Sequence, residues 1–162
     1  MSRARVPLAA ALLLAGAVAP ARAQFREPAR VQPAGRVDVL ASHITAIQAG
    51  TELSLPAGRA LRLSLVGGAG GSWADGRSGL SARAELAGRF LLDPNFSARW
   101  APYVGGGGGA RYDHIAGWRA VLVVFVGMEG PNWNGVIPFV EVGYGGGGRI
   151  GLGLRKTRGR GR

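Results

Sequence analysis

The sequence predicts an all-β protein: an antiparallel up-and-down β-barrel of six to eight strands, preceded by a signal peptide. Two observations lead to this prediction. Apolar side chains recur at every second residue through several segments, the longest of which is 136–154, and a period of two is that of a β-strand. Glycine makes up 29 of the 162 residues, far above the average of about 7%, and it shows no collagen-like period.

Residues 1–23 have the features of a secretory signal peptide. Arg3 and Arg5 form a basic start, an apolar run from Val6 to Val18 follows, and residues 21–23 match an A-x-A cleavage pattern. The apolar run is shorter than the roughly 20 residues that a transmembrane helix needs. The sequence therefore predicts export, with a mature chain that starts at Gln24.

The mature chain is predicted to begin with a flexible lead-in, residues 24–43, because its first part is polar and contains two prolines. Within it, residues 37–43 fit either a short strand or a helical turn. The barrel domain is predicted to cover residues 44–155, and residues 156–162 form a basic C-terminal tail.

The first predicted strands are separated by recognisable turn residues. Residues 44–55 and 60–71 both alternate, and residues 56–59, Pro-Ala-Gly-Arg, favour a turn between them, so the two segments are predicted to form a hairpin. Residues 72–79 are predicted to be a loop. Residues 80–92 alternate most regularly, although a helix stays an alternative there because the residue types have fair helix propensity. The apolar face of that segment consists of Leu80, Ala82, Ala84, Leu86, Gly88, Phe90 and Leu92.

The later strands are rich in glycine. Residues 99–113 continue the alternation through five consecutive glycines, whereas residues 118–128 are apolar on both faces, which predicts a buried strand or one that packs against an apolar part of the lumen. The turn at 130–135 precedes the longest alternation. The count is six strands, and it becomes eight if residues 37–43 also pair and residues 145–148 form a turn.

The charged residues of these segments lie on the face opposite the apolar one. In a barrel this face lines the lumen, where buried charges must neutralise one another; the alternative is a lining for a pore or a ligand cavity. Glycines on this face are predicted to leave room for bulky partners across the lumen and to ease the bends of closure. The predicted lumen network consists of Glu52, Arg62, Arg83, Glu85, Arg89, Arg119, Glu141 and Arg149, with Arg155 on the same face.

Aromatic residues near the strand ends suggest a membrane girdle. Trp100 and Tyr112 fall on one face, twelve residues apart, which is roughly 40 Å along a strand, or roughly 28 Å of depth at a tilt near 45°. That depth matches the separation of two aromatic girdles across a bilayer. The predicted girdle consists of Trp100, Tyr112, Trp118 and Tyr144.

No enzymatic, cofactor or metal site is predicted. The glycine runs 105–109 and 145–148 are followed by Ala-Arg and Arg-Ile, not by the Lys-Ser/Thr that ends a P-loop, and they lack a strand–turn–helix context. His43 and His114 have neither a positioned nucleophile nor clustered carboxylates and are predicted to be surface residues. The absence of cysteine excludes disulfides and thiolate sites.

The charge of the mature chain suggests its partners. Removing residues 1–23 takes away three arginines, so 17 basic and 9 acidic residues remain, a net charge of +8. Such a balance attracts anionic surfaces. For an exported chain the predicted partners are the lipid bilayer and its anionic head groups rather than nucleic acid. The sequence does not indicate an oligomeric state.

The chain resembles the small outer-membrane β-barrel proteins of bacteria, of the OmpA/OmpX-like type. The resemblance covers about residues 44–155 and rests on the signal peptide, on residues 100–104 (Trp-Ala-Pro-Tyr-Val) before the first glycine run, and on the ending at 138–144 and 151–155. It implies a membrane-embedded barrel with a structural, adhesive or small-pore role. The family usually ends on an aromatic residue and has long extracellular loops, whereas this chain ends in basic residues and its loops are short.

A second class of protein fits the same alternation. A soluble exported barrel or sandwich, periplasmic or secreted, would bury the apolar face in a core and bind a small ligand or a partner. The two classes differ in one structural respect, which is whether the apolar face lies inside or outside the barrel.

Overall fold

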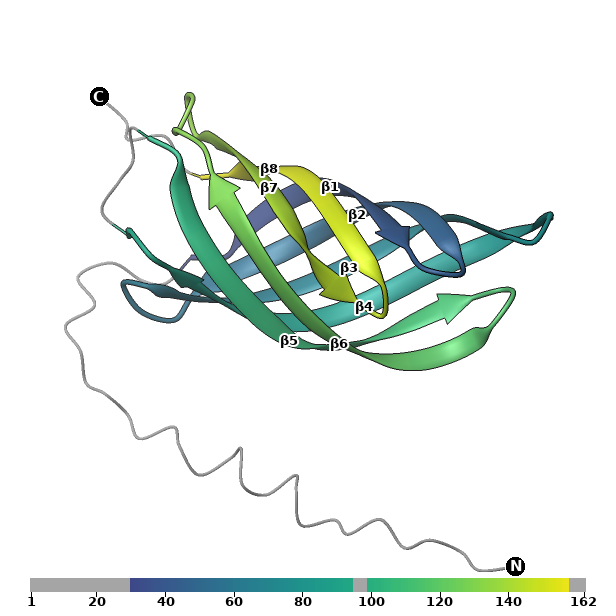
Figure 1. Ribbon diagram of the computed structural model, residues 1–162. Coiled ribbons are helices and arrows are strands. Elements are labelled where there is room, and N and C mark those ends of the chain that lie inside the picture. Colours follow the sequence, from purple (N-terminus) through teal and green to yellow (C-terminus); the bar gives the residue numbers. More distant parts are fainter. Residues whose placement is uncertain (1–29, 95–98, 158–162) are drawn as a thin grey trace, which may run out of the picture.

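The computed structural model describes residues 30–94 and 99–157 (Figure 1). The predicted signal peptide and residues 158–162 of the predicted tail lie outside the described residues. Eight strands form one closed barrel in sequence order, each antiparallel to its neighbours, and the first pairs with the last. The strands are β1 (Gln32–Ala41), β2 (Thr45–Pro56), β3 (Leu61–Ala74), β4 (Arg77–Leu91), β5 (Ala101–Asp113), β6 (Gly117–Glu129), β7 (Val136–Gly145) and β8 (Gly148–Lys156).

The predicted up-and-down barrel is confirmed, and of the predicted six to eight strands the structure has eight. Gly146 and Gly147, with φ of 73° and 154°, form the turn that divides residues 136–154 into β7 and β8. The helix alternative for residues 80–92 is wrong, because this segment belongs to β4. Residues 118–128 belong to β6, whose inward side chains form an apolar cluster with residues of β4 and β5.

Two segments differ from the sequence prediction. Residues 32–36, predicted to belong to a flexible lead-in, form β1 together with residues 37–41, for which a strand was one of the two alternatives, and β1 pairs with both β2 and β8. Residues 72–79, predicted to be a loop, are almost entirely strand, because Asp75 and Gly76 alone make the turn between β3 and β4. Both have positive φ, 49° and 73°, as a two-residue type I′ hairpin requires.

The barrel has two distinct ends. The end that we call the terminal end holds Arg30, Thr157, the connections 57–60 and 130–135, the end of β4 and the start of β5. The other, which we call the hairpin end, holds the connections 42–44, 75–76, 114–116 and 146–147. The β3–β4 and β5–β6 hairpins extend farthest at the hairpin end, on the right of Figure 1.

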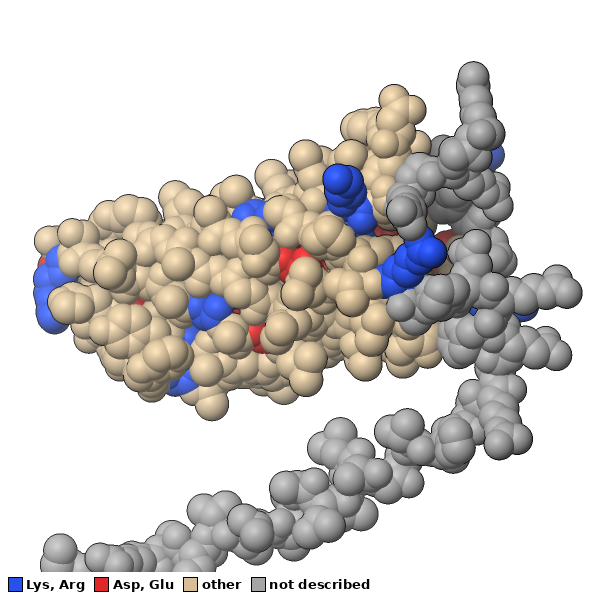
Figure 2. Space-filling model, turned by 180° about the vertical axis from the view of Figure 1, so that it is seen from behind, with Lys and Arg blue, Asp and Glu red and all other residues tan. Residues whose placement is uncertain are grey.

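The wall of the barrel is apolar outside and polar inside. Among the described residues, 27 large hydrophobic side chains are exposed, and every strand contributes at least one, whereas twelve charged side chains are buried. Most of the wall in Figure 2 is accordingly uncharged. The alternation that the sequence predicted for β4 therefore places its apolar face outward, away from the lumen.

Three interior aromatic rings each lie over a glycine on the neighbouring strand. The pairs are Tyr103 with Gly127, Phe125 with Gly105, and Phe139 with Gly153, and each pair is directly opposite in the register. A Cβ built on these glycines would lie 2.3–2.5 Å from the ring. The glycines do leave room for bulky partners, but on the adjacent strand and not across the lumen.

We expect Gly153→Ala to destabilise the barrel by about 1–3 kcal/mol, the usual cost of overpacking a filled interior. Its Cβ would lie 2.3 Å from Cζ of Phe139 and 2.6 Å from the carbonyl oxygen of Gly35, so the ring must move off three guanidinium groups that it contacts. Urea unfolding in detergent micelles measures the change. Gly35→Ala is the control, because nothing lies within 4 Å of its Cβ, and an equal loss in both variants would contradict the packing argument.

Candidate functional site in the barrel lumen

Glu141 of β7 is the centre of the lumen network. Its side chain is fully buried and accepts hydrogen bonds from Arg36 at 2.7 Å, Arg89 at 2.6 Å and Arg149 at 2.8 Å. The hydroxyl of Tyr103 donates a fourth, at 2.9 Å. One carboxylate therefore joins β1, β4, β5 and β8, strands from all around the barrel, through charge-assisted hydrogen bonds.

Glu52 of β2 is a second centre, nearer the terminal end. It accepts from Arg36 at 2.9 Å, from both terminal nitrogens of Arg89, and from Arg155 at 3.1 Å. The hydroxyl of Ser54 donates to it as well, at 2.7 Å. Arg36 and Arg89 thus connect Glu52 to Glu141, and the two centres form one network.

The ion pairs cross the lumen. Glu85 of β4 accepts from Arg149 of β8 at 2.8 Å, and β4 and β8 lie four strands apart in either direction around an eight-stranded barrel. Asp38 pairs with Arg36 at 2.7 Å and also with Arg83. An interior that a salt bridge spans from wall to opposite wall is filled at that level by side chains.

Two smaller clusters lie nearer the ends. At the terminal end, Glu129 accepts two hydrogen bonds from Arg62, at 2.6 and 2.8 Å, and another from Arg155. At the hairpin end, Asp113 pairs with Arg111 at 3.0 Å and with Arg119. Arg155 links the first cluster to Glu52, whereas Asp113 is linked outside its cluster through Ser81, which accepts a hydrogen bond from Gln48 at 2.7 Å.

The interior aromatic rings pack against the arginines. The guanidinium of Arg89 lies 5.5–5.6 Å from the ring centroids of Tyr103, Phe125 and Phe139, within the range of a cation–π contact. Arg149 lies similarly over Phe125. The positive charges of these arginines are therefore stabilised by carboxylates and also by the π faces of the rings.

The structure places the side chains of all eight predicted network residues inside the barrel. Seven of them, from β2, β3, β4, β7 and β8, join one network through shared partners, and Arg119 belongs to the separate Asp113 cluster. Sequence reasoning missed Arg36, Asp38, Tyr103, Arg111, Asp113 and Glu129. Arg111 and Asp113 share the parity of the inward face of their strand, so the alternation alone could have placed both side chains in the lumen.

The predicted girdle residues lie on the outer wall. Trp100 is at the terminal end, and Tyr112 and Trp118 pack against each other at the hairpin end, with ring centroids 5.3 Å apart. Tyr144 lies near the β7–β8 turn, opposite Val124 in the middle of β6. Two exposed tryptophans were missed: Trp133 in the 130–135 connection and Trp73 beside the β3–β4 turn, so tryptophan occurs at both ends of the wall.

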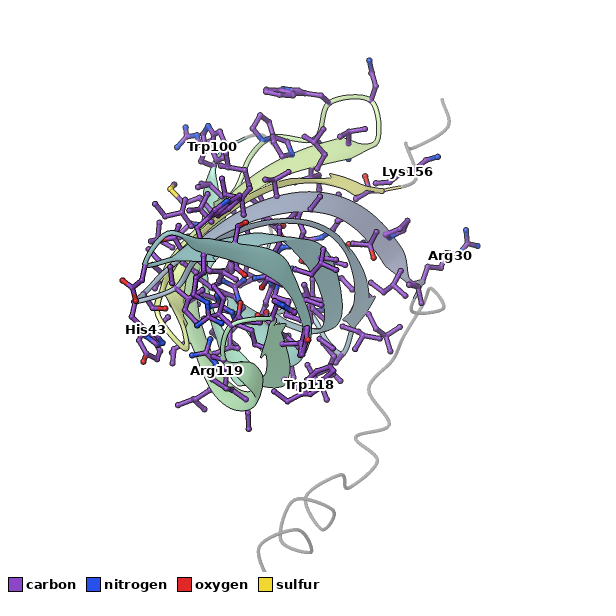
Figure 3. The ribbon with its side chains drawn as sticks, turned by 90° about the vertical axis from the view of Figure 1, so that its right-hand side faces the viewer. Arg30, His43, Trp100, Trp118, Arg119 and Lys156 are labelled. Atoms are coloured by element: carbon purple, nitrogen blue, oxygen red, sulfur yellow. The ribbon has the colours of Figure 1, made fainter. Side chains whose placement is uncertain are left out.

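Other kinds of site find little support in the described part of the chain. His43 and His114 are exposed in connections at the hairpin end, where Figure 3 shows His43 at the edge of the barrel mouth. Residues 30–94 and 99–157 contain no group of three or more metal-ligating side chains. Within the same ranges, no helix is long and apolar enough to cross a membrane.

The comparisons with known proteins support the fold. No family model and no curated protein matches the sequence. Among solved structures, the chain is similar to the N-terminal β-barrel domain of Pseudomonas aeruginosa OprF, with a TM-score of 0.52 and 12% sequence identity, over 80% of this chain and 98% of that domain. The likeness shows the fold, a closed antiparallel β-barrel of the kind that the sequence resemblance implied.

Proposed function

We propose that the mature chain is a bacterial outer-membrane β-barrel protein with a structural role, whose lumen is closed by its Arg/Glu network. The observation that supports this most strongly is the inverted distribution of residue types. Among the described residues, 27 large hydrophobic side chains are exposed, 23 of them on the strands of the wall, and twelve charged side chains are buried inside. A barrel folded for water would place these two groups the other way round.

The size of the apolar wall argues against the soluble alternative. The largest apolar patch on a soluble monomer covers about 300–600 Å², whereas here exposed aliphatic and aromatic side chains occur on all eight strands. In a bilayer the same wall contacts hydrocarbon, and tryptophan at both ends of the barrel suits the two membrane interfaces.

The closed lumen favours a structural role over a pore. The Glu85–Arg149 pair joins opposite walls, and Arg89 reaches both Glu52 and Glu141. Ions that crossed the barrel would have to break several charge-assisted hydrogen bonds at once. The short connections at the hairpin end, of two or three residues each, also leave little surface for adhesion.

The terminal end carries a basic rim. Arg30, Arg59 and Lys156 are exposed there, and positive residues appear in Figure 2 next to the grey atoms at that end. Exposed cations at a membrane surface are attracted to anionic head groups by about 1 kcal/mol each. We place this rim against anionic lipid head groups.

Cell fractionation tests the membrane location. We expect the mature chain in the outer-membrane fraction, resistant to extraction by alkaline carbonate and released only by detergent, because the apolar wall needs a hydrocarbon contact. A known periplasmic protein and a known outer-membrane protein in the same cells serve as controls. Recovery of the chain from the periplasm or the medium without detergent would favour the soluble ligand-binding barrel instead.

A further inference from the structure

Three arginines form a row inside the hairpin end of the lumen. Arg83 of β4 lies directly opposite Arg111 of β5, and Arg111 lies directly opposite Arg119 of β6. All three belong to the inward face of their strands, with side-chain exposures of 1% for Arg83 and Arg111 and 27% for Arg119. Like charges directly opposite each other destabilise a sheet, so this row, which we call the arginine row, needs compensation.

The lumen as a whole holds more arginines than carboxylates, and the arginine row accounts for the difference in number. The interior ion pairs involve eight arginines and six carboxylates. Outside the row and its partner Asp113, five of each remain: Arg36, Arg62, Arg89, Arg149 and Arg155 with Asp38, Glu52, Glu85, Glu129 and Glu141. The row with Asp113 carries three positive charges and one negative charge. The lumen therefore has a surplus of +2. Arg111 and Arg119 share Asp113, and Arg83 shares Asp38 and Glu85 with Arg36 and Arg149.

Each arginine of the row also has donors to spare. Asp113 accepts hydrogen bonds from Arg111 and Arg119 and also from Ser81. Asp38 accepts from Arg83 and from Arg36, and Glu85 lies 3.5 Å from Arg83. Among the described residues, Nε of Arg83, Nη1 of Arg111 and Nε of Arg119 are buried and have no hydrogen-bond partner. Leaving a buried charged donor unpaired is costly, so these nitrogens favour an additional acceptor.

The row is reachable from outside. β7 pairs with β6 only as far as Val123, so the part of the β5–β6 hairpin that holds Arg111 and Arg119 extends past the β7–β8 turn. Arg119 lies near the mouth of the barrel in Figure 3, and its side chain is partly exposed. On the other side, the position opposite Arg83 is Gly68, and the side chains of Arg83 and Gln48 lie against it.

We propose that the arginine row binds a small divalent oxyanion of the phosphate or sulfate class. Two negative charges match the surplus of +2, and tetrahedral oxygens can accept hydrogen bonds from several planar guanidinium groups at once. The site requires only the barrel fold and is independent of the membrane location, so the two proposals can fail separately. It adds a ligand to a lumen that is otherwise closed by its own side chains.

Thermal melting of the full mature chain in a phosphate-free, non-ionic detergent tests the site. Inorganic phosphate is titrated against chloride at constant ionic strength, and we expect a rise of several degrees in the melting temperature that saturates, because a ligand that binds only the folded state stabilises it. Equilibrium dialysis with radiolabelled phosphate should give one anion per chain. A short-chain phosphatidic acid is a second arm, and the stronger response identifies a free anion or a lipid head group as the source.

Arg111→Gln should abolish the phosphate-dependent rise and the dialysis signal. Arg62→Gln is the matched control, because it removes a lumen arginine at the terminal end, where charges balance, and it should keep both responses. Arg119→Gln, with its partly exposed side chain, serves if Arg111→Gln does not fold, and it should weaken binding at least tenfold. Equal responses of the wild type and the row variants would show an adventitious ion only and overturn the proposal.

Discussion

Glu141→Gln is expected to lower the free energy of unfolding by about 3–5 kcal/mol, the usual cost of removing one partner from a buried ion pair. The amide keeps the size of the side chain but loses the charge that Arg36, Arg89 and Arg149 share. One side of the amide would also present N–H donors to guanidinium donors. Urea unfolding of the folded barrel in detergent micelles measures the loss.

Asp75→Asn is the matched control for that substitution. It also replaces a carboxylate by an amide, but in an exposed turn where asparagine tolerates the positive φ of 49°, so stability should change by less than about 0.5 kcal/mol. Planar-bilayer conductance separates the closed lumen from a pore. Unchanged stability of Glu141→Gln together with steady, anion-shifted conductance would contradict a lumen filled by the network.

The alternation of residues was enough to predict the barrel type, because a side-chain period of two is a local property of a strand. For β1 it left residues 37–43 open between a strand and a helical turn and assigned no strand before them, because Pro33 and Gly35 are turn-like residue types. Pro33 is tolerated there because the ladder with β8 starts only at Ala34, so the missing N–H costs no hydrogen bond on that side.

The pairing within the lumen could not be predicted. Arg36 and Glu141 are 105 residues apart in the sequence, and they meet only because β1 closes the barrel against β8. Closure and stagger are properties of the whole sheet, and no local pattern encodes them. Parity gave the face of each charged residue but not its partner, which is why Arg119 was grouped with a network that it does not join.

Leu86→Arg is expected to destabilise the barrel in lipid bilayers by about 2–4 kcal/mol, the cost of arginine on the lipid face near the midplane. Leu86 lies near the middle of β4, and its side chain is 62% exposed on the outer wall. Unfolding in vesicles of uncharged lipid, followed by tryptophan fluorescence, measures the change.

Leu92→Arg is the control, because it places the same arginine nearer the membrane interface than Leu86→Arg does. Leu92 follows the end of β4 at the terminal end and is 55% exposed. The six residues from Leu86 span about 20 Å along a strand, or about 14 Å of depth at a tilt of 45°, which is roughly half of an apolar band. Arginine at position 92 can therefore reach the interface, and it should cost at most about 1 kcal/mol.

If water surrounded the wall, both positions would already face solvent and both substitutions would be tolerated equally. A difference between the two variants thus reports hydrocarbon at the centre of the wall, and equal effects would contradict the membrane assignment.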